Sequence, residues 1–297
     1  MIEGKRIVAW TPFGRRETVS ILFAYMFREH ERGLVDEWWL CLNTDPGQQA
    51  DDVAYAYQMA ARHSNFIKIV QRPDGVPRLH PKQRNTGYFY RYMADDAARE
   101  TVFVRFDDDI IYVHEDAVER LVRHRLETQV GLCSFPVMWN NSVVSWYLQK
   151  AGVIPEGDYG TQHWPTVGGP YCMDPVGWAD GRFGVQMHRF LLEHIEAGTT
   201  DKCLLYQDYQ LPVGMQYSVS VFASLGSVYA DLSKPGVLEP SEEESWHTIH
   251  QPARLQQPNT LVGDALVSHY TFFPQGPIIR STDILDHYRL IASRLLD

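Results

Sequence analysis

The chain has 297 residues, a hydrophobic content of 44% and a formal net charge of −10. This length is sufficient to bury a substantial core in one large domain. The acidic balance argues against a protein that coats nucleic acid or anionic lipid, because such proteins neutralise phosphates with clustered Lys and Arg.

The cysteines and the N-terminal segment bear on the expected compartment. Four cysteines lie far apart without a CxxC pair, which argues against a zinc knuckle or a disulfide framework. The segment MIEGKRIVAWTPFG lacks the apolar region of a signal peptide, and no uninterrupted apolar run reaches membrane-spanning length. We therefore expect a soluble, cytoplasmic protein with reduced thiols and no membrane span.

Strand-like and helix-like segments alternate through the first half of the chain. Short runs rich in β-branched and aromatic residues predict strands at 6–11, 37–43, 66–70, 101–106 and 131–137. Helical patterns are predicted at 18–32, 49–63, 83–99 and after Asp116, which stands at an N-cap position with Glu119 three residues on. This alternation is typical of βαβ units and predicts an α/β fold with a mostly parallel sheet between helices.

The pattern changes after the fifth predicted strand. Residues 139–184 are rich in Gly, Pro and aromatic residues, which is typical either of a substrate-covering region or of an irregular packed connection. A helix is predicted at about 185–197, ended by Gly198. The acidic run EPSEEES at 239–245 is predicted to be a solvated surface loop.

Three consecutive aspartates, Asp107, Asp108 and Asp109, follow the strand predicted at 101–106. In an extended strand, Asp107 and Asp109 would share one face. Two such carboxylates can hold Mg²⁺ or Mn²⁺, which prefer oxygen ligands and leave positions for phosphate oxygens. In a mostly parallel sheet, ligands bind beyond the carboxyl ends of the strands, where these aspartates are expected. A hydrated turn without metal is the alternative that spacing leaves open.

The segment VFVRFDDD, at the end of the fourth strand in a series of βα units, resembles the DxD motif of nucleotide-sugar glycosyltransferases of the GT-A fold. The resemblance covers mainly residues 5–137. It implies a single GT-A type domain with a Rossmann-like sheet, in which residues 1–137 bind the nucleotide sugar and the less regular residues 138–297 bind the acceptor. It also implies that Asp107 and Asp109 bind Mn²⁺ or Mg²⁺, with Asp107 and Asp108 facing the donor.

The same resemblance implies further contacts with the donor. Thr11, Pro12 and Phe13, at the end of the first strand, would lie near the base and ribose. Arg84 and Asn85, in the segment PKQRNTGYFYRYM, would face the nucleotide or the sugar.

Three other side chains are candidates for the phosphate or the metal. Arg15 and Arg16 either reach a phosphate, which guanidinium groups bind bidentately, or form a basic pair on the surface at a helix start. Many GT-A enzymes complete the metal shell with a histidine near the C-terminus, and His269 in GDALVSHYTFF holds such a position. The alternative for His269 is a structural hydrogen bond.

An inverting transfer needs a general base to remove the proton of the acceptor hydroxyl. Asp208, in CLLYQDYQLP, is similar to the acidic position that supplies this base in inverting members, and Asp180, in GWADGRFG, is a second candidate or a ligand of a sugar hydroxyl. For both, a helix-capping role is the alternative. Trp164 and Trp178 either stack on a sugar or pack in the core.

The predicted function is a metal-dependent glycosyltransferase. It would move a sugar from a nucleoside-diphosphate sugar, with UDP as the default, to a hydroxyl of a glycan, a small molecule or a modified DNA. The sequence has no GxSxG, GxxxxGK[ST] or helix-opening GxGxxG motif, which argues against simple hydrolase, P-loop and dinucleotide-binding classes. A nucleotidyltransferase of similar α/β fold and a non-catalytic binding module remain as alternatives.

Overall fold

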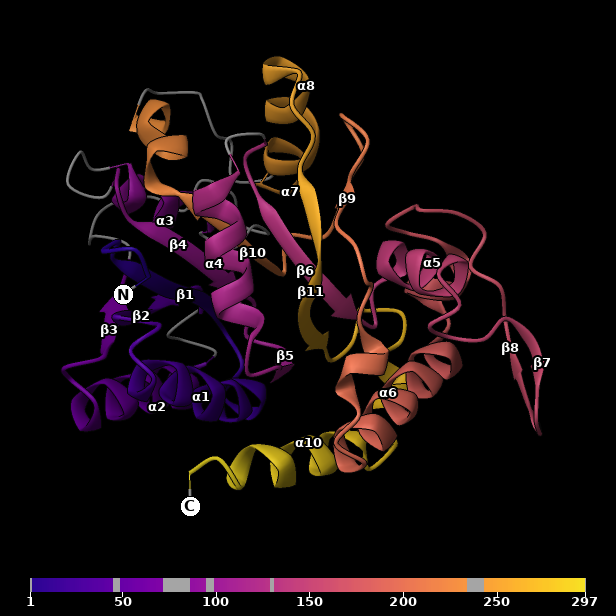
Figure 1. The fold of residues 1–297 in the computed structure, drawn as a ribbon. Coiled ribbons are helices and arrows are strands. Elements are labelled where there is room, and N and C mark those ends of the chain that lie inside the picture. Colours follow the sequence, from indigo (N-terminus) through magenta and orange to yellow (C-terminus); the bar gives the residue numbers. More distant parts are fainter. Residues whose placement is uncertain are drawn as a thin grey trace.

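The computed structural model describes residues 2–44, 49–71, 86–94, 99–128, 131–233 and 243–296, which build a mixed sheet flanked by helices (Figure 1). The strands are β1 (Ile7–Phe13), β2 (Glu37–Leu42), β3 (Ile67–Val70), β4 (Val102–Phe106), β5 (Ile110–Val113), β6 (Ser134–Trp139), β7 (Gly157–Tyr159), β8 (Gln162–Trp164), β9 (Tyr209–Gln210), β10 (Val221–Leu225) and β11 (Thr260–His269). The α-helices are α1 (Arg16–Glu31), α2 (Ala50–Arg62), α3 (Thr86–Met93), α4 (Ala117–Glu127), α5 (Ser142–Lys150), α6 (Gly181–Glu196), α7 (Glu243–Ser245), α8 (Gln251–Leu255), α9 (Gly276–Ile279) and α10 (Ile284–Ser293).

The main sheet has the strand order β3-β2-β1-β4-β10-β6-β11-β5, with β9 paired to β11. The first four strands in this order run parallel, and β6 and β11 are parallel to each other. The short strand β10 is antiparallel to both of its neighbours and joins the two parallel sets. The predicted α/β architecture with a mostly parallel sheet is therefore confirmed.

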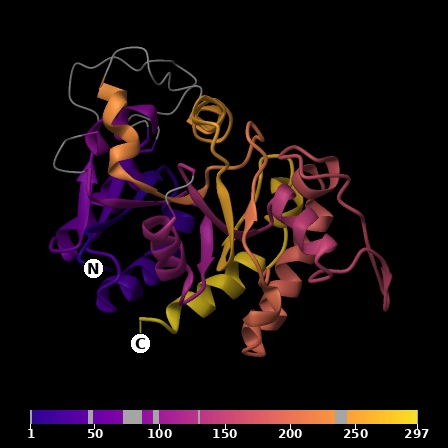
Figure 2. The ribbon, with the colours of Figure 1, turned by 45° about the horizontal axis from the view of Figure 1, so that its top comes forward.

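Helices cover both faces of the sheet. The connections β1-α1-β2 and β2-α2-β3 advance in one direction along the sheet, whereas the chain moves the opposite way from β4 through α4 to β6. Right-handed crossovers then place α1 and α2 on one face and α4 on the other (Figures 1 and 2). The core between these layers is rich in aromatic side chains, including the fully buried Trp10, Trp38 and Trp139.

The sheet curls next to the three aspartates. Only these residues separate β4 from β5, yet β5 pairs with β11 at the far end of the strand order and packs on α1. A flat sheet does not allow this step, so strong twisting brings the end of β11 close to the end of β4. The carboxyl ends of β4 and β11 therefore meet at one place.

The second half of the chain contributes central strands. Figure 1 shows β11, in yellow-orange, beside the magenta strand β6, and β10 lies between β4 and β6. The pairing of β11 with β6 shifts register between Val262 and Leu266, so three residues of β11 bulge out of the ladder. At the start of this bulge, a side chain on Gly263 would meet the Gln207 carbonyl oxygen at 2.2 Å.

Several element boundaries differ from the predictions. Residues 139–184 contain the largely buried helix α5, whose N-cap Asn141 accepts a hydrogen bond from the Val144 N–H at 3.1 Å. Helix α6 begins at Gly181, four residues before the predicted start. Asp116 lies at the start of α4, but its side chain forms no capping hydrogen bond there. Tight packing, which a local pattern does not reveal, explains the first two differences.

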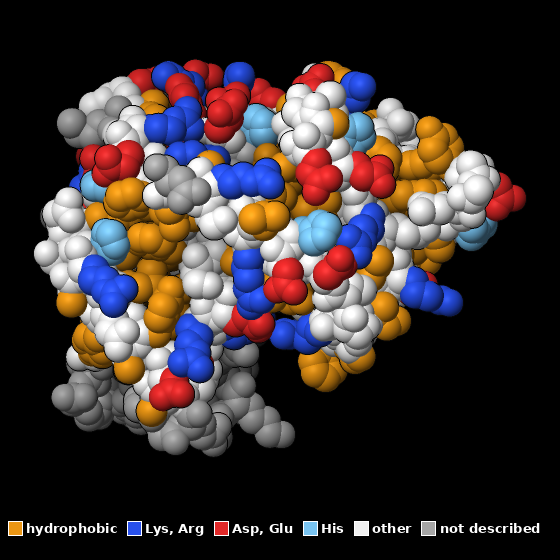
Figure 3. Space-filling view, turned by 90° about the horizontal axis from the view of Figure 1, so that it is seen from below, with side chains coloured by type: hydrophobic (Ala, Val, Ile, Leu, Met, Phe, Trp, Pro, Cys, Tyr) orange, Lys and Arg blue, Asp and Glu red, His pale blue; other side chains and the backbone are white. Residues whose placement is uncertain are grey.

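The surface mixes the two signs of charge. In the view from below, acidic and basic side chains alternate, with hydrophobic side chains between them (Figure 3). On this face, therefore, the excess of acidic residues is not gathered into one patch.

Candidate functional site

The three aspartates form a turn beyond the carboxyl end of β4. The Asp107 N–H donates to the Ser220 carbonyl oxygen at 2.7 Å, and the Ile110 N–H donates back to the Asp107 carbonyl oxygen at 3.2 Å. The strand ends at Phe106, as predicted, so Asp107 and Asp109 do not share the face that an extended strand would give them. Their side chains are consequently distributed between two different arginines.

Arg15 binds Asp108 and Asp109 together. Its Nε donates to Asp108 Oδ1 at 2.8 Å, and its Nη1 donates to Asp109 Oδ2 at 2.9 Å. Asp108 Oδ2 also accepts the Gly14 N–H at 2.7 Å. A Cβ at position 14 would lie 3.2 Å from that oxygen, so glycine permits this close approach. The end of β1 is thus fastened to the aspartate turn.

His269, the last residue of β11, completes the cluster. Its Nε2 lies 3.2 Å from Asp109 Oδ2, and both side chains are almost fully buried. The Tyr270 N–H donates to the Asp109 carbonyl oxygen at 2.9 Å, which fixes the end of β11 against the turn. Asp109 Oδ1 and His269 Nδ1 are buried without a hydrogen-bond partner in the described part of the chain. Such orphaned atoms are unusual unless a ligand satisfies them.

Asp107 belongs to a second buried network. Arg105, on β4, donates from Nε and Nη2 to Asp107 Oδ1 at 2.9 and 2.7 Å. The same guanidinium contacts Glu243 and donates to the Tyr90 hydroxyl at 3.1 Å. It also lies 5.1 Å from the centroid of the Trp10 ring. This network fixes the direction in which the turn leaves the sheet.

The two carboxyl groups that Arg15 binds have pKa values shifted in opposite directions. Burial raises the pKa of Asp108 to about 6; the charge of Asp109 adds to this rise, and Arg15 opposes it. Burial also acts to raise the pKa of Asp109, but His269 and Arg15 outweigh it and hold the pKa below its usual value. Asp109 is therefore ionised at neutral pH, as a metal ligand must be.

The donor set fits a divalent cation in part. His269 Nε2 and Asp109 Oδ2 face each other at 3.2 Å, and the remaining nitrogen and oxygen, Nδ1 and Oδ1, are buried without a partner in the described part of the chain. Among the residues described, no group of three or more His, Cys, Asp or Glu side chains is arranged to hold a metal ion. Mg²⁺ and Mn²⁺ are commonly held by one or two carboxylates with substrate phosphates and water in the remaining positions. Two protein ligands are thus consistent with a cation that arrives with a diphosphate.

The predicted donor contacts are not at the surface. Strand β1 continues through Thr11, Pro12 and Phe13, and all three side chains are buried. The Thr11 hydroxyl accepts a hydrogen bond from Trp38 Nε1 at 3.0 Å. The strand ends at Phe13, two residues beyond the predicted end at Thr11. Arg84 and Asn85 lie outside the described residues.

Within the described residues, the two aspartates predicted to be catalytic form their hydrogen bonds away from the aspartate turn. Asp208 Oδ1 accepts the Gly263 N–H at 2.8 Å. Gly263 is six residues before His269 on β11, which corresponds to about 20 Å of extended strand, a distance that the bulge shortens. Asp180 caps α6 by accepting the Arg182 N–H at 2.9 Å. Each of these carboxylates therefore has a structural role, as the acceptor of a backbone N–H hydrogen bond.

Other predicted residues have structural roles as well. Trp164 is buried and packs edge-to-face on Phe183 and Phe190, so it presents no free face to a sugar. Arg16 is exposed and lies 3.7 Å from Asp51 and 3.8 Å from Asp52, as the surface alternative expected.

The sequence reasoning missed the residues that hold the aspartates in place. The sequence analysis assigned no role to Gly14 or to Arg105. A charged residue inside the buried run VFVRF was the available signal, since a buried guanidinium needs carboxylate partners. The contact with Glu243 had no local signal, because it joins segments far apart in the chain.

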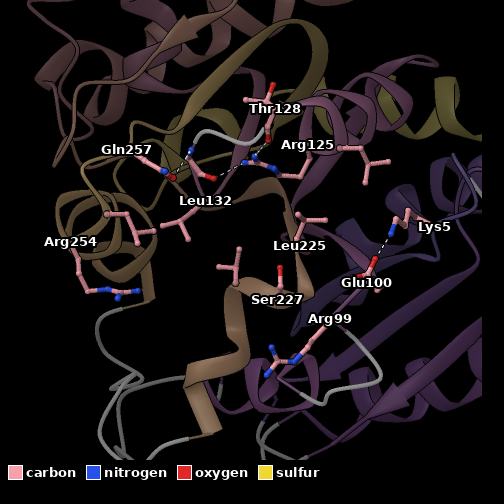
Figure 4. A pocket seen from close by; sticks show the side chains of 14 residues that line it. Lys5, Arg99, Glu100, Arg125, Thr128, Leu132, Leu225, Ser227, Arg254 and Gln257 are labelled. Atoms are coloured by element: carbon pink, nitrogen blue, oxygen red, sulfur yellow. Dashed lines mark hydrogen bonds and ion pairs between the residues drawn. The ribbon is translucent and has the colours of Figure 1, made fainter.

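A separate cavity lies at the opposite edge of the sheet. It has a volume of 580 Å³ and is lined by residues that precede β4 and β6 and by the end of β10. Figure 4 shows Arg99, Arg125 and Arg254 around it, with Lys5 and Glu100 paired at one side. It includes no member of the aspartate cluster, so it is not the candidate site.

Within the described residues, no helix combines the length and the apolar character needed to cross a membrane.

No family model matches the chain, and no curated protein matches it. Among solved structures, it is similar to CMP:2-keto-3-deoxy-manno-octonic acid synthetase complexed with CTP, with 9% identity, a TM-score of 0.42 and 98% of each chain covered. It is also similar to glucosyl-3-phosphoglycerate synthase from Mycobacterium tuberculosis in complex with Mn²⁺, UDP-glucose and phosphoglyceric acid, with 15% identity, a TM-score of 0.36, and 83% of this chain and 68% of that chain covered. For 4-diphosphocytidyl-2C-methyl-D-erythritol synthase from Anaerococcus prevotii, the identity is 14% and the TM-score 0.31; the match covers 45% of this chain and 56%, little more than half, of that one. These likenesses are distant and carry no argument about activity.

Proposed function

We propose that this protein is a metal-dependent glycosyltransferase that takes a sugar from a nucleoside-diphosphate sugar, by default a UDP-sugar, and joins it to a hydroxyl acceptor. One observation carries the proposal. Asp109 and His269 lie side by side and buried at the carboxyl edge of the sheet, and each has a ligand atom without a partner in the described residues. Buried carboxylate and imidazole groups in this state favour a cation site.

In this proposal each side chain has a distinct task. Asp109 and His269 hold Mn²⁺ or Mg²⁺. Asp108 fixes Gly14 and Arg15, so that the guanidinium, which is one-third exposed, is available to a phosphate beside the cluster. When bound, the cation would offset charge on the departing diphosphate. Arg105 keeps the turn in place through Asp107. No general base is assigned, because the Asp208 and Asp180 carboxylates are already bound to the Gly263 and Arg182 N–H groups.

The loop after β1 supports a nucleotidyltransferase less well than it supports a glycosyltransferase. Such enzymes usually carry a glycine-rich basic loop there, which can offer backbone N–H groups to phosphates. Here the segment TPFGRRE has one glycine, and its N–H already donates to Asp108 at 2.7 Å. This contact favours sugar transfer over nucleotidyl transfer.

The test measures donor binding and turnover in parallel. Melting temperature is recorded with UDP, GDP, CDP and ADP and their sugars, each with Mn²⁺, with Mg²⁺ or with a chelator. Release of nucleoside diphosphate from each sugar donor is then assayed. We expect one nucleotide to raise the melting temperature only with metal, since a ligand that binds the native state stabilises it.

Two variants make the result specific. Asp109→Asn should lose the metal-dependent shift and about 100-fold of the turnover. Its own melting temperature should fall, because Arg15 and His269 lose a buried ionic partner, so turnover is compared at a temperature where both proteins are folded. The matched control is Asp201→Asn, whose side chain is exposed on a different segment. Retained turnover in Asp109→Asn would reject the proposal. Pyrophosphate release from a nucleoside triphosphate and a sugar phosphate would instead establish nucleotidyl transfer.

A further inference from the structure

A second cavity opens directly beside the aspartate cluster. It has a volume of 690 Å³. One wall is Arg15, the residue that binds Asp108 and Asp109, and the other walls come from the segment that follows His269. The lining residues are Arg15, Thr271, Phe272, Phe273, Pro274, Gly276, Pro277 and Arg280. A molecule in this cavity would therefore lie next to the proposed donor site.

The wall formed by residues 271–277 is held rigidly. Gln275 is fully buried, and its Oε1 accepts hydrogen bonds from Asn140 Nδ2 at 2.9 Å and from the Phe272 N–H at 3.3 Å. Asn140 also donates to the Tyr270 carbonyl oxygen at 2.9 Å. Its φ of 59° is a left-handed conformation that asparagine tolerates. The wall is thus preorganised rather than a loose loop.

Phe273 stands out from this rigid wall. Its side chain is 95% exposed, the highest value among the large hydrophobic side chains whose exposure the structure describes. The neighbouring Phe272 instead packs on His269, with ring centroids 4.4 Å apart. An aromatic ring held in water by a fixed backbone is a typical platform for a sugar or another ring.

The charge of the cavity is positive. Its charged lining residues are Arg15 and Arg280, and no carboxylate lines it among the described residues. Arg15 is neutralised by Asp108 and Asp109. Arg280 Nη1 lies 4.0 Å from Glu17 Oε2, a long contact, and the other oxygen of Glu17 is bound by Arg289 at 2.9 Å. The guanidinium of Arg280 is therefore the main attraction for an anion in this cavity.

We propose that this cavity binds the acceptor and that the acceptor carries an anionic group beside a ring: the phosphate or carboxylate pairs with Arg280, and the ring stacks on Phe273. This inference rests on the proposed function, since it names the acceptor class of the same site. A guanidinium binds phosphate and carboxylate with the same paired geometry, so the experiment must distinguish the two.

The first arm of the test measures binding without turnover. Calorimetry compares glucose, glucose 6-phosphate, glucuronate and glycerol 3-phosphate as probes. We expect the two anionic rings to bind at least about 10-fold more tightly than glucose, in line with a charge-assisted pair. The ringless glycerol 3-phosphate should bind more weakly than glucose 6-phosphate. The stronger of glucose 6-phosphate and glucuronate identifies the anion as phosphate or carboxylate.

The second arm uses exposed residues whose replacement leaves the fold intact. Arg280→Gln should remove the preference for anionic rings, and Phe273→Ala should weaken all ring probes by a similar factor. The matched control is Arg120→Gln, an arginine of similar exposure that pairs with Asp264 and does not line the cavity. With the donor identified above, both cavity variants should raise the acceptor KM and leave hydrolysis of the donor unchanged.

The outcomes separate the two proposals. Equal binding of charged and neutral rings, or a preference that survives Arg280→Gln, would overturn the acceptor inference even if the donor is hydrolysed. Selective anion binding in a protein that hydrolyses no donor would instead reject the proposed function while leaving the cavity as an anion site.

Discussion

Replacement of Asp108 by alanine should lower the free energy of unfolding by about 2 kcal/mol. The carboxylate joins the end of β1 to the turn after β4, across 94 residues of sequence. Its Oδ2 accepts the Gly14 N–H at 2.7 Å, and its Oδ1 accepts the Arg15 Nε at 2.8 Å. The side chain is only 2% exposed, so water does not readily replace it.

The expected loss of about 2 kcal/mol in Asp108→Ala depends on which partners of the carboxylate lose a hydrogen bond. A hydrogen bond to a charged group contributes about 1.5–3 kcal/mol, and the Gly14 N–H loses one in full. Arg15 is 34% exposed and keeps Asp109, so its loss is screened and contributes less than about 1 kcal/mol. Burial beside Asp107 and Asp109 raises the pKa of Asp108, which means that the ionised carboxylate is itself costly. This cost keeps the net loss well below the sum of the bonds.

The assay is urea unfolding at pH 7.5 with a chelator present, followed by tryptophan fluorescence. The matched control is Asp51→Ala, because this carboxylate is 84% exposed and lies 3.7 Å from Arg16. The control should change the unfolding free energy by less than about 0.5 kcal/mol. If Asp108→Ala is no more destabilising than Asp51→Ala, the reasoning about the fastened turn is refuted.

Further predictions concern the rest of the sheet. Burial acts to raise the pKa of Glu37, but hydrogen bonds led by that from Lys68 outweigh it and lower the pKa to about 2. The stabilisation from this carboxylate is therefore complete above pH 4.5 and lost as the pH falls towards 2. In urea titrations, the free energy of unfolding of the wild type should exceed that of Glu37→Gln by about 1–2 kcal/mol at pH 7 and by little at pH 2. The same difference at both pH values would contradict this prediction. Arg105→Lys should cost about 3 kcal/mol, since an ammonium group cannot fill the buried fork, and unchanged thermal stability would show that the fork geometry is unimportant. Gly263→Ala should cost more than about 2 kcal/mol, because its Cβ would lie 2.2 Å from a backbone carbonyl oxygen. Gly169→Ala, where nothing lies within 4 Å, is its control, and equal melting temperatures would count against the clash.

Local sequence patterns located most of the sheet. Apolar β-branched runs predicted β1 to β4 and β6 to within a few residues, and the parallel arrangement correctly put the aspartates at a carboxyl edge. The strand boundaries were less accurate. Strand β1 continues to Phe13, two residues beyond its predicted end, and β6 begins three residues later than predicted.

The remaining features depend on contacts between distant segments. No local pattern indicated that β10 enters the sheet between β4 and β6, or that Glu243 would contact Arg105. Asp208 was chosen as a candidate base because it follows an apolar run. That run does not show that Asp208 would bind β11 at Gly263, six residues before His269. His269 could be placed near the cluster only by resemblance, and the pairing of β11 with β5 explains why it lies there.

The curled sheet has a consequence for biosynthesis. The ribosome delivers Gly14 and Arg15 early, the aspartates later, and His269 only with β11, the last strand in chain order to enter the sheet. Until then the aspartates lack the imidazole, and β6 and β5 each present an open edge where β11 will pair. Such non-local pairings form slowly and leave nascent chains prone to association. The cluster of Asp109 and His269 can therefore form only after β11 has joined the sheet.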